Sequence, residues 1–197
     1  ERAVDILDMV GIPDPEENID KYPYQLSGGM RQRVMIAIAL ACQPELLIAD
    51  EPTTALDVTI QAQILKLMKE LKQEVDTSIM LITHDLGVIA QMVERVLVFY
   101  AGQVVERAKI SDLFNEPKHP YTEGLIRSIP RVGKKRKRLD TIPGIVPSPF
   151  DFPEGCRFEP RCEQSMDICA EKQPIETDVG KGHQSRCWLN VKEGDRR

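Results

Sequence analysis

The stretch LLIADEP occupies residues 46–52, where an apolar run ends abruptly in two acids and a proline. Such a run is typical of a strand that is buried on both faces of a parallel sheet. A second run, IMLI at residues 79–82, ends in the same way before Thr83-His84-Asp85. Between the two, apolar residues repeat at helical spacing from Ile60 to Leu71. Strand, helix and strand in this order predict an α/β layer with a parallel sheet.

Further elements are predicted on both sides of this layer. Apolar residues between positions 3 and 10 share one helical face, and a second helix opens at Gly28-Gly29 and stops at Pro44. A shorter helix is expected from 88 to 93. Residues 96–100 and 103–106, separated by a glycine-containing turn, are typical of a hairpin.

The character of the sequence changes after Lys109, where prolines become frequent. We expect a boundary between Lys109 and Pro120, with residues 1–110 forming one part and residues 111–197 an irregular, loop-rich C-terminal module. The basic run from Lys134 to Arg138 is interpreted as a solvated linker, with contact to anionic lipid headgroups as the less favoured alternative.

The bulk composition excludes several classes of protein. The chain has 197 residues, 42% of them hydrophobic, and 26 basic against 31 acidic residues give a net charge of -5. A dedicated DNA-binding protein is usually basic, so this charge argues against one. No apolar run approaches the roughly 18 residues that span a bilayer, and no signal peptide is evident, so we expect a soluble chain. Cys42, in an apolar helix, is expected to be a small buried hydrophobe.

Asp50 and Glu51 follow a predicted strand, at the end of the sheet where open α/β sheets bind ligands. Neighbouring strand residues point to opposite sides, so the two carboxylates can take different tasks. The first can hold Mg²⁺, while the second can orient or deprotonate an attacking water. For an isolated pair of acids, a solvated strand end would be the simpler interpretation.

The string LSGGMRQR at residues 26–33 places a serine and two glycines at a predicted helix start. Glycines allow a close approach of backbone to ligand, and the free N–H groups of a helix N-terminus favour an anion. Ser27 also suits an ordinary N-cap, and Asp57 suits the N-cap of the helix that begins near Val58. His84, directly after the second apolar run, can donate to a phosphate oxygen and to a water.

Taken together, LSGGMRQR, LLIADEP, TALD and the histidine after LIT resemble the ATP-binding subunits of ABC transporters, in order and spacing from Tyr24 to Glu106. The resemblance implies a partial P-loop NTPase (RecA-like) core with part of the helical signature subdomain. It also implies two subunits that face each other head to tail across ATP. The implied roles are the signature motif for Ser27, Gly28, Gly29 and Gln32, the Mg²⁺ partner for Asp50, the general base for Glu51, the D-loop for Asp57 and the switch histidine for His84.

The sequence departs from that family at one decisive point, because G-x-x-x-x-G-K-S/T occurs nowhere in it. Without that loop and its lysine the phosphates have no cradle in this chain. We therefore expect that an N-terminal portion is missing, that the intact protein hydrolyses ATP, and that this portion alone is inactive.

The C-terminal part points to one branch of the family. The sequences around His119-Pro120-Tyr121, Ile142-Pro143-Gly144 and Gly155-Cys156-Arg157 look like the extension of dipeptide and oligopeptide importer ATPases. Related nickel importers have similar tails and remain an alternative. Soluble ABC ATPases of translation or DNA repair are disfavoured because they lack this tail. A stand-alone metal-binding or regulatory module without ATPase activity is the alternative from a different class.

Four cysteines lie in the last part of the chain, at positions 156, 162, 169 and 187. Disulfides are rarely maintained in the cytosol, and zinc ribbons usually use tighter C-x₂₋₄-C pairs. Wider spacing suits a Cys₄ cluster such as 4Fe–4S, which the family resemblance also favours. Zinc and no metal at all remain open. His119 and His183 are treated as non-ligands, although His183 lies near Cys187 in the sequence.

The resemblance also implies the setting in which the protein works. The expected partners are a second ATPase subunit, identical or not, transmembrane permease subunits, and indirectly an extracytoplasmic substrate-binding protein. The expected location is peripheral, on the cytoplasmic face of the cell membrane. The transported substrate is not evident from this sequence, because the binding protein and the permease select it.

Overall fold

A computed structural model of the protein describes residues 1–54, 56–74, 77–130 and 140–196. The chain divides into two compact units, Glu1–Met92 and Val93–Arg197. The sequence predicts a division by expected role, into residues 1–110 and residues 111–197, and this division stays a prediction. The basic run 134–138 lies outside the described residues. Among those that are described, no helix combines the length and apolar character that a membrane crossing requires.

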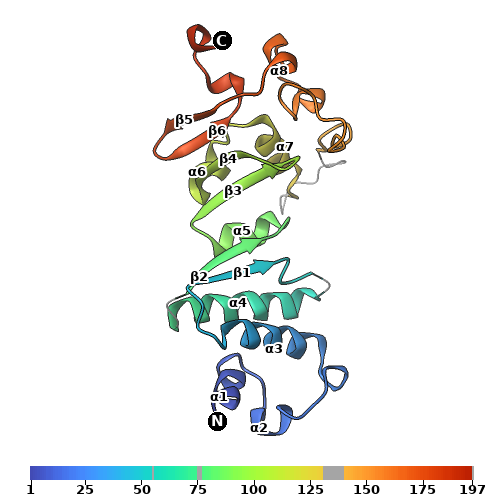
Figure 1. Ribbon diagram of the computed structural model, residues 1–197, viewed down its shortest axis with the longest axis vertical. Helices are drawn as coiled ribbons and strands as arrows, with labels where there is room; N and C mark the ends of the chain where they lie inside the picture. Colours follow the sequence, from blue (N-terminus) through green and yellow to red (C-terminus); the bar gives the residue numbers. More distant parts are fainter. Residues whose placement is uncertain (55, 75–76, 131–139, 197) are drawn as a thin grey trace. The chain divides into compact units, whose positions relative to one another are not determined.

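The first unit is an α/β layer (Figure 1). Strands β1 (Leu46–Asp50) and β2 (Ser78–Ile82) are parallel neighbours, with Asp50 opposite Ile82. The helices and the 3₁₀ turn are α1 (Arg2–Met9), α2 (Pro15–Asn18), η1 (Pro23–Gln25), α3 (Gly28–Leu40), α4 (Val58–Glu74) and α5 (Leu86–Met92). The predicted order of strand, helix and strand is confirmed.

One face of the two-stranded sheet is covered, and the other is exposed. Leu47, Ala49, Ile79 and Leu81 pack against a core built mainly from α3 and α4, in which Ile64 and Met68 are almost fully buried. The opposite face carries exposed side chains, with Ile48 57% and Met80 46% accessible. The prediction of strands buried on both faces is therefore wrong for the described chain, because its helices cover a single face.

The location of Cys42 also differs from the prediction. It lies beyond the end of α3 at Leu40, and its side chain is exposed. The helix ends before it, so Cys42 leaves the packed face that Ile36, Ala37 and Leu40 share. The expectation of a small buried hydrophobe is wrong at this position.

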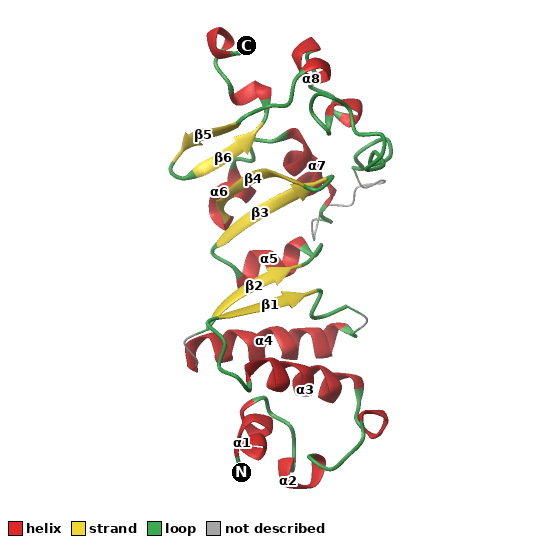
Figure 2. Ribbon diagram, in the orientation of Figure 1, coloured by secondary structure: helices red, strands yellow, loops and turns green. Residues whose placement is uncertain are grey.

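The second unit is built on a four-stranded sheet in the order β3-β4-β6-β5 (Figure 2). The predicted hairpin is confirmed as β3 (Arg95–Tyr100) and β4 (Gln103–Lys109). The C-terminal part adds β5 (Glu176–Gly180) and β6 (His183–Arg186), which are more regular than the loop-rich module that the sequence suggested. Its helices are α6 (Ile110–Asn115), α7 (Pro120–Ser128) and α8 (Asp167–Glu171), with 3₁₀ turns η2 (Glu159–Arg161), η3 (Trp188–Asn190) and η4 (Glu193–Asp195).

A buried carboxylate joins three segments of this second unit. Glu106, on β4, is 1% exposed, and its Oε1 lies 2.6 Å from Nε2 of the buried His183 on β6. The same carboxylate accepts hydrogen bonds from the backbone N–H groups of Lys118 and His119, at 2.6 and 3.0 Å. A buried polar group is tolerated when it is hydrogen-bonded, as both carboxyl oxygens of Glu106 are here. Glu106 thus ties the hairpin to α7 and to the C-terminal strands.

Candidate active site

Two of the predicted catalytic residues meet where β1 and β2 end. Because these strands are parallel neighbours, their carboxyl ends lie together, and the residues that follow them are brought close. The backbone N–H of Glu51 donates to the carbonyl of Ile82 at 2.9 Å, which fastens the two ends. His84 Nδ1 then lies 2.8 Å from Oε1 of Glu51.

Glu51 no longer follows the strand direction of Asp50. Its φ is 47°, in the left-handed region that non-glycine residues rarely adopt. A turn begins here, in which the N–H of Thr54 donates to the carbonyl of Glu51 at 3.1 Å. This turn brings the Thr54 hydroxyl to 2.8 Å from Oε2 of Glu51. Both oxygens of one carboxylate are therefore hydrogen-bonded.

The electrostatics of this pair favour its ionised form. The hydrogen bond from His84, followed by that from Thr54, lowers the pKa of the Glu51 carboxyl. The hydrogen bond to Glu51 in turn raises the pKa of His84 above its ordinary value of 6.5. Glu51 is thus held as a carboxylate at neutral pH, which is the form that a general base needs.

The helix that the signature-like string opens has the predicted cap. Ser27 precedes α3, and its Oγ accepts a hydrogen bond from the N–H of Met30 at 3.2 Å. In the part of the chain that the structure describes, a Cβ added to Gly28 would meet no neighbouring atom within 4 Å, so the space beside it is open. A Cβ on Gly29 would lie 3.0 Å from Cγ2 of Ile60, so Gly29 lets α3 approach α4 closely. Gly29 therefore serves packing as well as leaving backbone accessible.

Gln32 and Asp57 both have partners inside the chain. The Gln32 side-chain amide donates to the carbonyl of Pro52 at 2.6 Å, next to Glu51 in sequence. Asp57 Oδ1 accepts from the N–H groups of Thr59 and Ile60, both at 3.0 Å, and so confirms the predicted N-cap of α4. A role in nucleotide binding for Gln32 and Asp57 stays a prediction.

Sequence reasoning overlooked Thr54 and the contact between Gln32 and Pro52. Thr54 stands three positions after Glu51, the spacing at which a hydroxyl can reach back across a turn, and that signal was available. The contact from Gln32 to Pro52 spans 20 positions, so no local pattern could have indicated it.

The four C-terminal cysteines lie near one another, without forming a metal site. Burial raises the pKa of the Cys156 and Cys162 thiols, and raises that of Cys187 to about 12, and neighbouring cysteines add to each of these shifts. Across the described part of the chain, however, no group of three or more His, Cys, Asp or Glu side chains is placed to hold a metal ion. In this arrangement the residues do not fit the predicted 4Fe–4S cluster.

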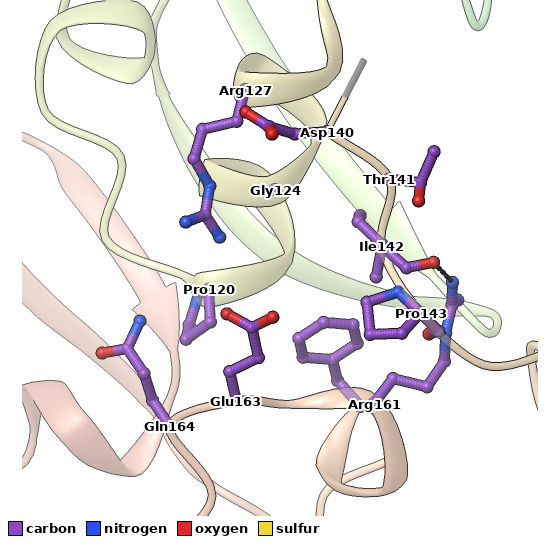
Figure 3. A pocket seen from close by; sticks show the side chains of 11 residues that line it. Pro120, Gly124, Arg127, Asp140, Thr141, Ile142, Pro143, Arg161, Glu163 and Gln164 are labelled. Atoms are coloured by element: carbon purple, nitrogen blue, oxygen red, sulfur yellow. Dashed lines mark hydrogen bonds between the residues drawn. The ribbon is translucent and has the colours of Figure 1, made fainter. Parts of the chain in front are cut away.

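The second unit also contains a cavity of about 230 Å³, which is drawn in Figure 3. Arg161 from η2 stabilises its wall, because its guanidinium donates to the carbonyls of Ile142 and Pro143 at 3.2 and 2.8 Å. The cavity contains none of the residues predicted to act on a nucleotide. It is lined by Pro120, Gly124, Arg127, Asp140, Thr141, Ile142, Pro143, Phe158, Arg161, Glu163 and Gln164.

Comparison with known proteins finds two matching family models. Residues 1–54 match the family model described as "ABC transporter", and residues 105–169 match "Oligopeptide/dipeptide transporter, C-terminal region". The chain therefore belongs to the ABC transporter family. The C-terminal match and the names of the relatives are more specific, because they refer to oligopeptide and dipeptide transport.

Two relatives illustrate the similarity. The chain is 58% identical, over 98% of its own length, to the oligopeptide transport ATP-binding protein AppD of Bacillus subtilis (strain 168). It is 50% identical over 100% of its length to the dipeptide transport ATP-binding protein DppD of Escherichia coli (strain K12). It spans 59% and 60% of these two proteins.

A solved structure that is similar to part of the chain is that of the ATP-binding cassette MJ0796, in a dimeric post-hydrolysis state bound to ADP and Pi. It is 37% identical, with a TM-score of 0.48 over 55% of this chain and 46% of that one.

Proposed function

We propose that this chain supplies the hydrolytic residues of an ATPase subunit in an ABC importer of dipeptides or oligopeptides. The observation that carries the proposal is the pairing of Glu51 with His84 at 2.8 Å, at the carboxyl end of a parallel sheet. The family match and the names of the relatives support ATP as the nucleotide and peptides as the cargo.

Glu51 and His84 have complementary tasks in this proposal. The Glu51 carboxylate accepts a proton from the water that attacks the γ-phosphate, and it is ionised for that purpose at neutral pH. The His84 imidazole holds Oε1 of that carboxylate through Nδ1 and would donate a hydrogen bond from Nε2 to a phosphate oxygen. Phosphoryl transfer depends mainly on such positioning and charge stabilisation.

Asp50 is the residue that would hold Mg²⁺. It is the last residue of β1, its side chain is exposed, and it directly precedes the proposed base. Mg²⁺ in nucleotide sites usually takes one or two carboxylates and completes its shell with water and phosphate oxygens. A single accessible carboxylate therefore fits the ion, which would neutralise charge on the phosphates.

The open helix start at Ser27 and Gly28 is proposed to contact the nucleotide from a second subunit. Its free N–H groups suit an anion, and no neighbouring atom of the described residues lies within 4 Å of a Cβ added to Gly28. The phosphates themselves need a G-x-x-x-x-G-K-S/T loop, which this sequence does not contain. ATP would thus lie between the loop of one subunit and the α3 start of another, so that binding closes the pair and hydrolysis releases it.

The central test is the Glu51→Gln substitution in the full-length protein assembled with its transporter. Removing the base while keeping its shape should lower the ATPase turnover by roughly 10²–10⁴-fold, with ATP binding retained. Phosphate release and nucleotide binding are measured on the same preparation. An unchanged turnover would remove Glu51 from this role.

The same ATPase assay compares residues 1–197 with the full-length protein. Residues 1–197 without a phosphate-binding loop are expected to show no ATPase activity above background. Measurable hydrolysis by these residues alone would contradict the proposed need for the missing loop.

The remaining proposals concern setting and partners. The permease would be contacted by a peripheral subunit on the cytoplasmic face of the membrane, and a second ATPase subunit would complete each nucleotide site. The binding protein and the permease would select the peptide.

We also retain a cysteine-bound iron–sulfur cluster as a proposal, although the residues as placed do not form its site. The supporting observation is that Cys156, Cys162 and Cys169 all lie close enough to Cys187 to contribute to the raised pKa of its thiol. Four thiolates are the donor set that a 4Fe–4S cluster requires.

Iron and acid-labile sulfide are measured on the full-length protein prepared without oxygen. We expect both in the unaltered protein, their loss in Cys187→Ser, and their retention in Cys42→Ser, where the exposed thiol belongs to the other unit. A colourless, iron-free preparation with all cysteines intact would disprove the cluster.

A further inference from the structure

The carboxylate of Glu51 is held by two donors from different segments. His84, after β2, lies 2.8 Å from Oε1, and the Thr54 hydroxyl lies 2.8 Å from Oε2. The family resemblance drew attention to the histidine only. Thr54 makes a bond of the same length to the other oxygen, so its geometry is equally suited to orient the carboxylate.

The turn that presents Thr54 is fixed at several points. The N–H of Thr54 donates to the Glu51 carbonyl at 3.1 Å, and the N–H of Glu51 donates to Ile82 at 2.9 Å. From α3, the Gln32 amide donates to the carbonyl of Pro52 at 2.6 Å. Pro52 itself is buried and has a fixed φ. The Thr54 hydroxyl is therefore presented by a defined turn rather than by a free loop.

The hydroxyl has a specific effect on the carboxylate. The Thr54 hydroxyl donates to Oε2 of the carboxylate, and a hydrogen bond to an ionised acceptor is stronger than one between neutral groups. It also opposes rotation of the carboxylate about its terminal bond, a torsion that is broad in free glutamate. Each carboxylate oxygen has further acceptor capacity, so both remain able to accept from water.

We propose that Thr54 is a positioning residue that orients the Glu51 carboxylate for proton transfer from water. This inference rests on the proposed function, because it assigns Thr54 a role through Glu51. The competing interpretation is that the Thr54 hydroxyl only closes a surface turn. The two differ in what its removal changes: the catalytic rate and its pH dependence in one case, local stability alone in the other.

The test uses Thr54→Val, which keeps the shape and removes the donor, in the full-length protein assembled with its transporter. We expect kcat to fall about tenfold, in line with the cost of misplacing a catalytic group, with KM for ATP changed less than about twofold. The acid limb of the kcat profile should move to higher pH, because the carboxyl loses a bond that favours its ionised form. Thr54→Ser, which restores the hydroxyl, should restore both.

Thr53→Val is the matched control, because it removes a hydroxyl one position away, whereas the described hydrogen bond to Oε2 of Glu51 comes from Thr54. It should leave kcat and the acid limb unchanged. If Thr54→Val unfolds the site, as judged by its melting temperature, Thr54→Ala is measured in its place. A Thr54→Val enzyme that matches Thr53→Val in rate and pH profile would overturn the inference.

A double variant separates this inference from the proposed function. If Thr54 acts through Glu51, adding Thr54→Val to Glu51→Gln should lower the remaining rate much less than about tenfold. An equal loss in both backgrounds would show that Thr54 acts independently of Glu51. A Glu51→Gln enzyme with normal turnover would instead refute the proposed function itself.

Discussion

The carboxylate of Glu51 and the imidazole of His84 each change how readily the other ionises. The pKa of Glu51 is lowered and that of His84 is raised, and the hydrogen bond between them is the largest cause in both. The charged pair therefore exists from below pH 4.5 to above pH 6.5. Its attraction is complete below the ordinary pKa of histidine and is lost as the pH rises through the raised pKa of His84. It is lost again as the pH falls through the lowered pKa of Glu51.

This coupling predicts a titration that NMR can follow in the full-length protein. The His84 ring resonances should titrate with a midpoint above 6.5, and Glu51→Gln should move that midpoint back toward 6.5, because the partner charge is gone. His84→Asn identifies the signal, because it removes the His84 resonance and leaves the other histidines in place. An identical midpoint with and without the Glu51 charge would show that the pair does not form in solution.

At the scale of elements, α7 depends on a buried histidine at its start. His119 is 2% exposed, and its Nδ1 accepts from the N–H of Tyr121 at 3.1 Å, as an N-cap does. Burial lowers the pKa of His119 to about 4. The cap thus requires a neutral ring, because Nδ1 can accept a hydrogen bond only when it is unprotonated.

The sign of the pH effect follows from that depressed pKa. Between pH 6.5 and 4 an unfolded chain protonates His119 while the folded one does not, so stability falls as the pH falls. The loss should approach about 3 kcal/mol near pH 4. Chemical denaturation of the full-length protein at several pH values measures it. His119→Asn keeps a capping oxygen without a titrating group, so its unfolding free energy should vary less over this range. An equally steep decline in that variant would rule out His119 as the source.

The accuracy of the sequence prediction differed between kinds of element. Strands β1 and β2 were located correctly because each is an apolar run that ends at charged or polar residues. The exposure of one sheet face was not predicted correctly, because the residues that cover a sheet face are distant in the sequence. Strands β5 and β6 were missed because ETDVG and HQSR show almost no apolar alternation. Their pairing depends instead on backbone bonds and on the contact of His183 with Glu106.

At the scale of the whole molecule, the candidate site could be predicted in part. The sequence order of Asp50-Glu51 and His84 predicted that the ends of two strands meet, and the structure brings Glu51 and His84 together. The partners of Gln32 and the grouping of the cysteines depend on tertiary packing, which no local pattern encodes. The two compact units meet in sequence at Met92 and Val93, between α5 and the hairpin, where neither composition nor proline content changes.

The position of β4 between β3 and β6 has a consequence for any shortened version of this protein. Loss of the chain from His183 onward would bare the backbone donors and acceptors of β4 at Glu106 and Arg107, and strip the buried carboxylate of its imidazole. An exposed edge strand can pair with a strand of another molecule through backbone hydrogen bonds, and such pairing leads to aggregation. The residues from His183 onward thus protect β4 from self-association. A protein that is truncated before His183 is expected to aggregate.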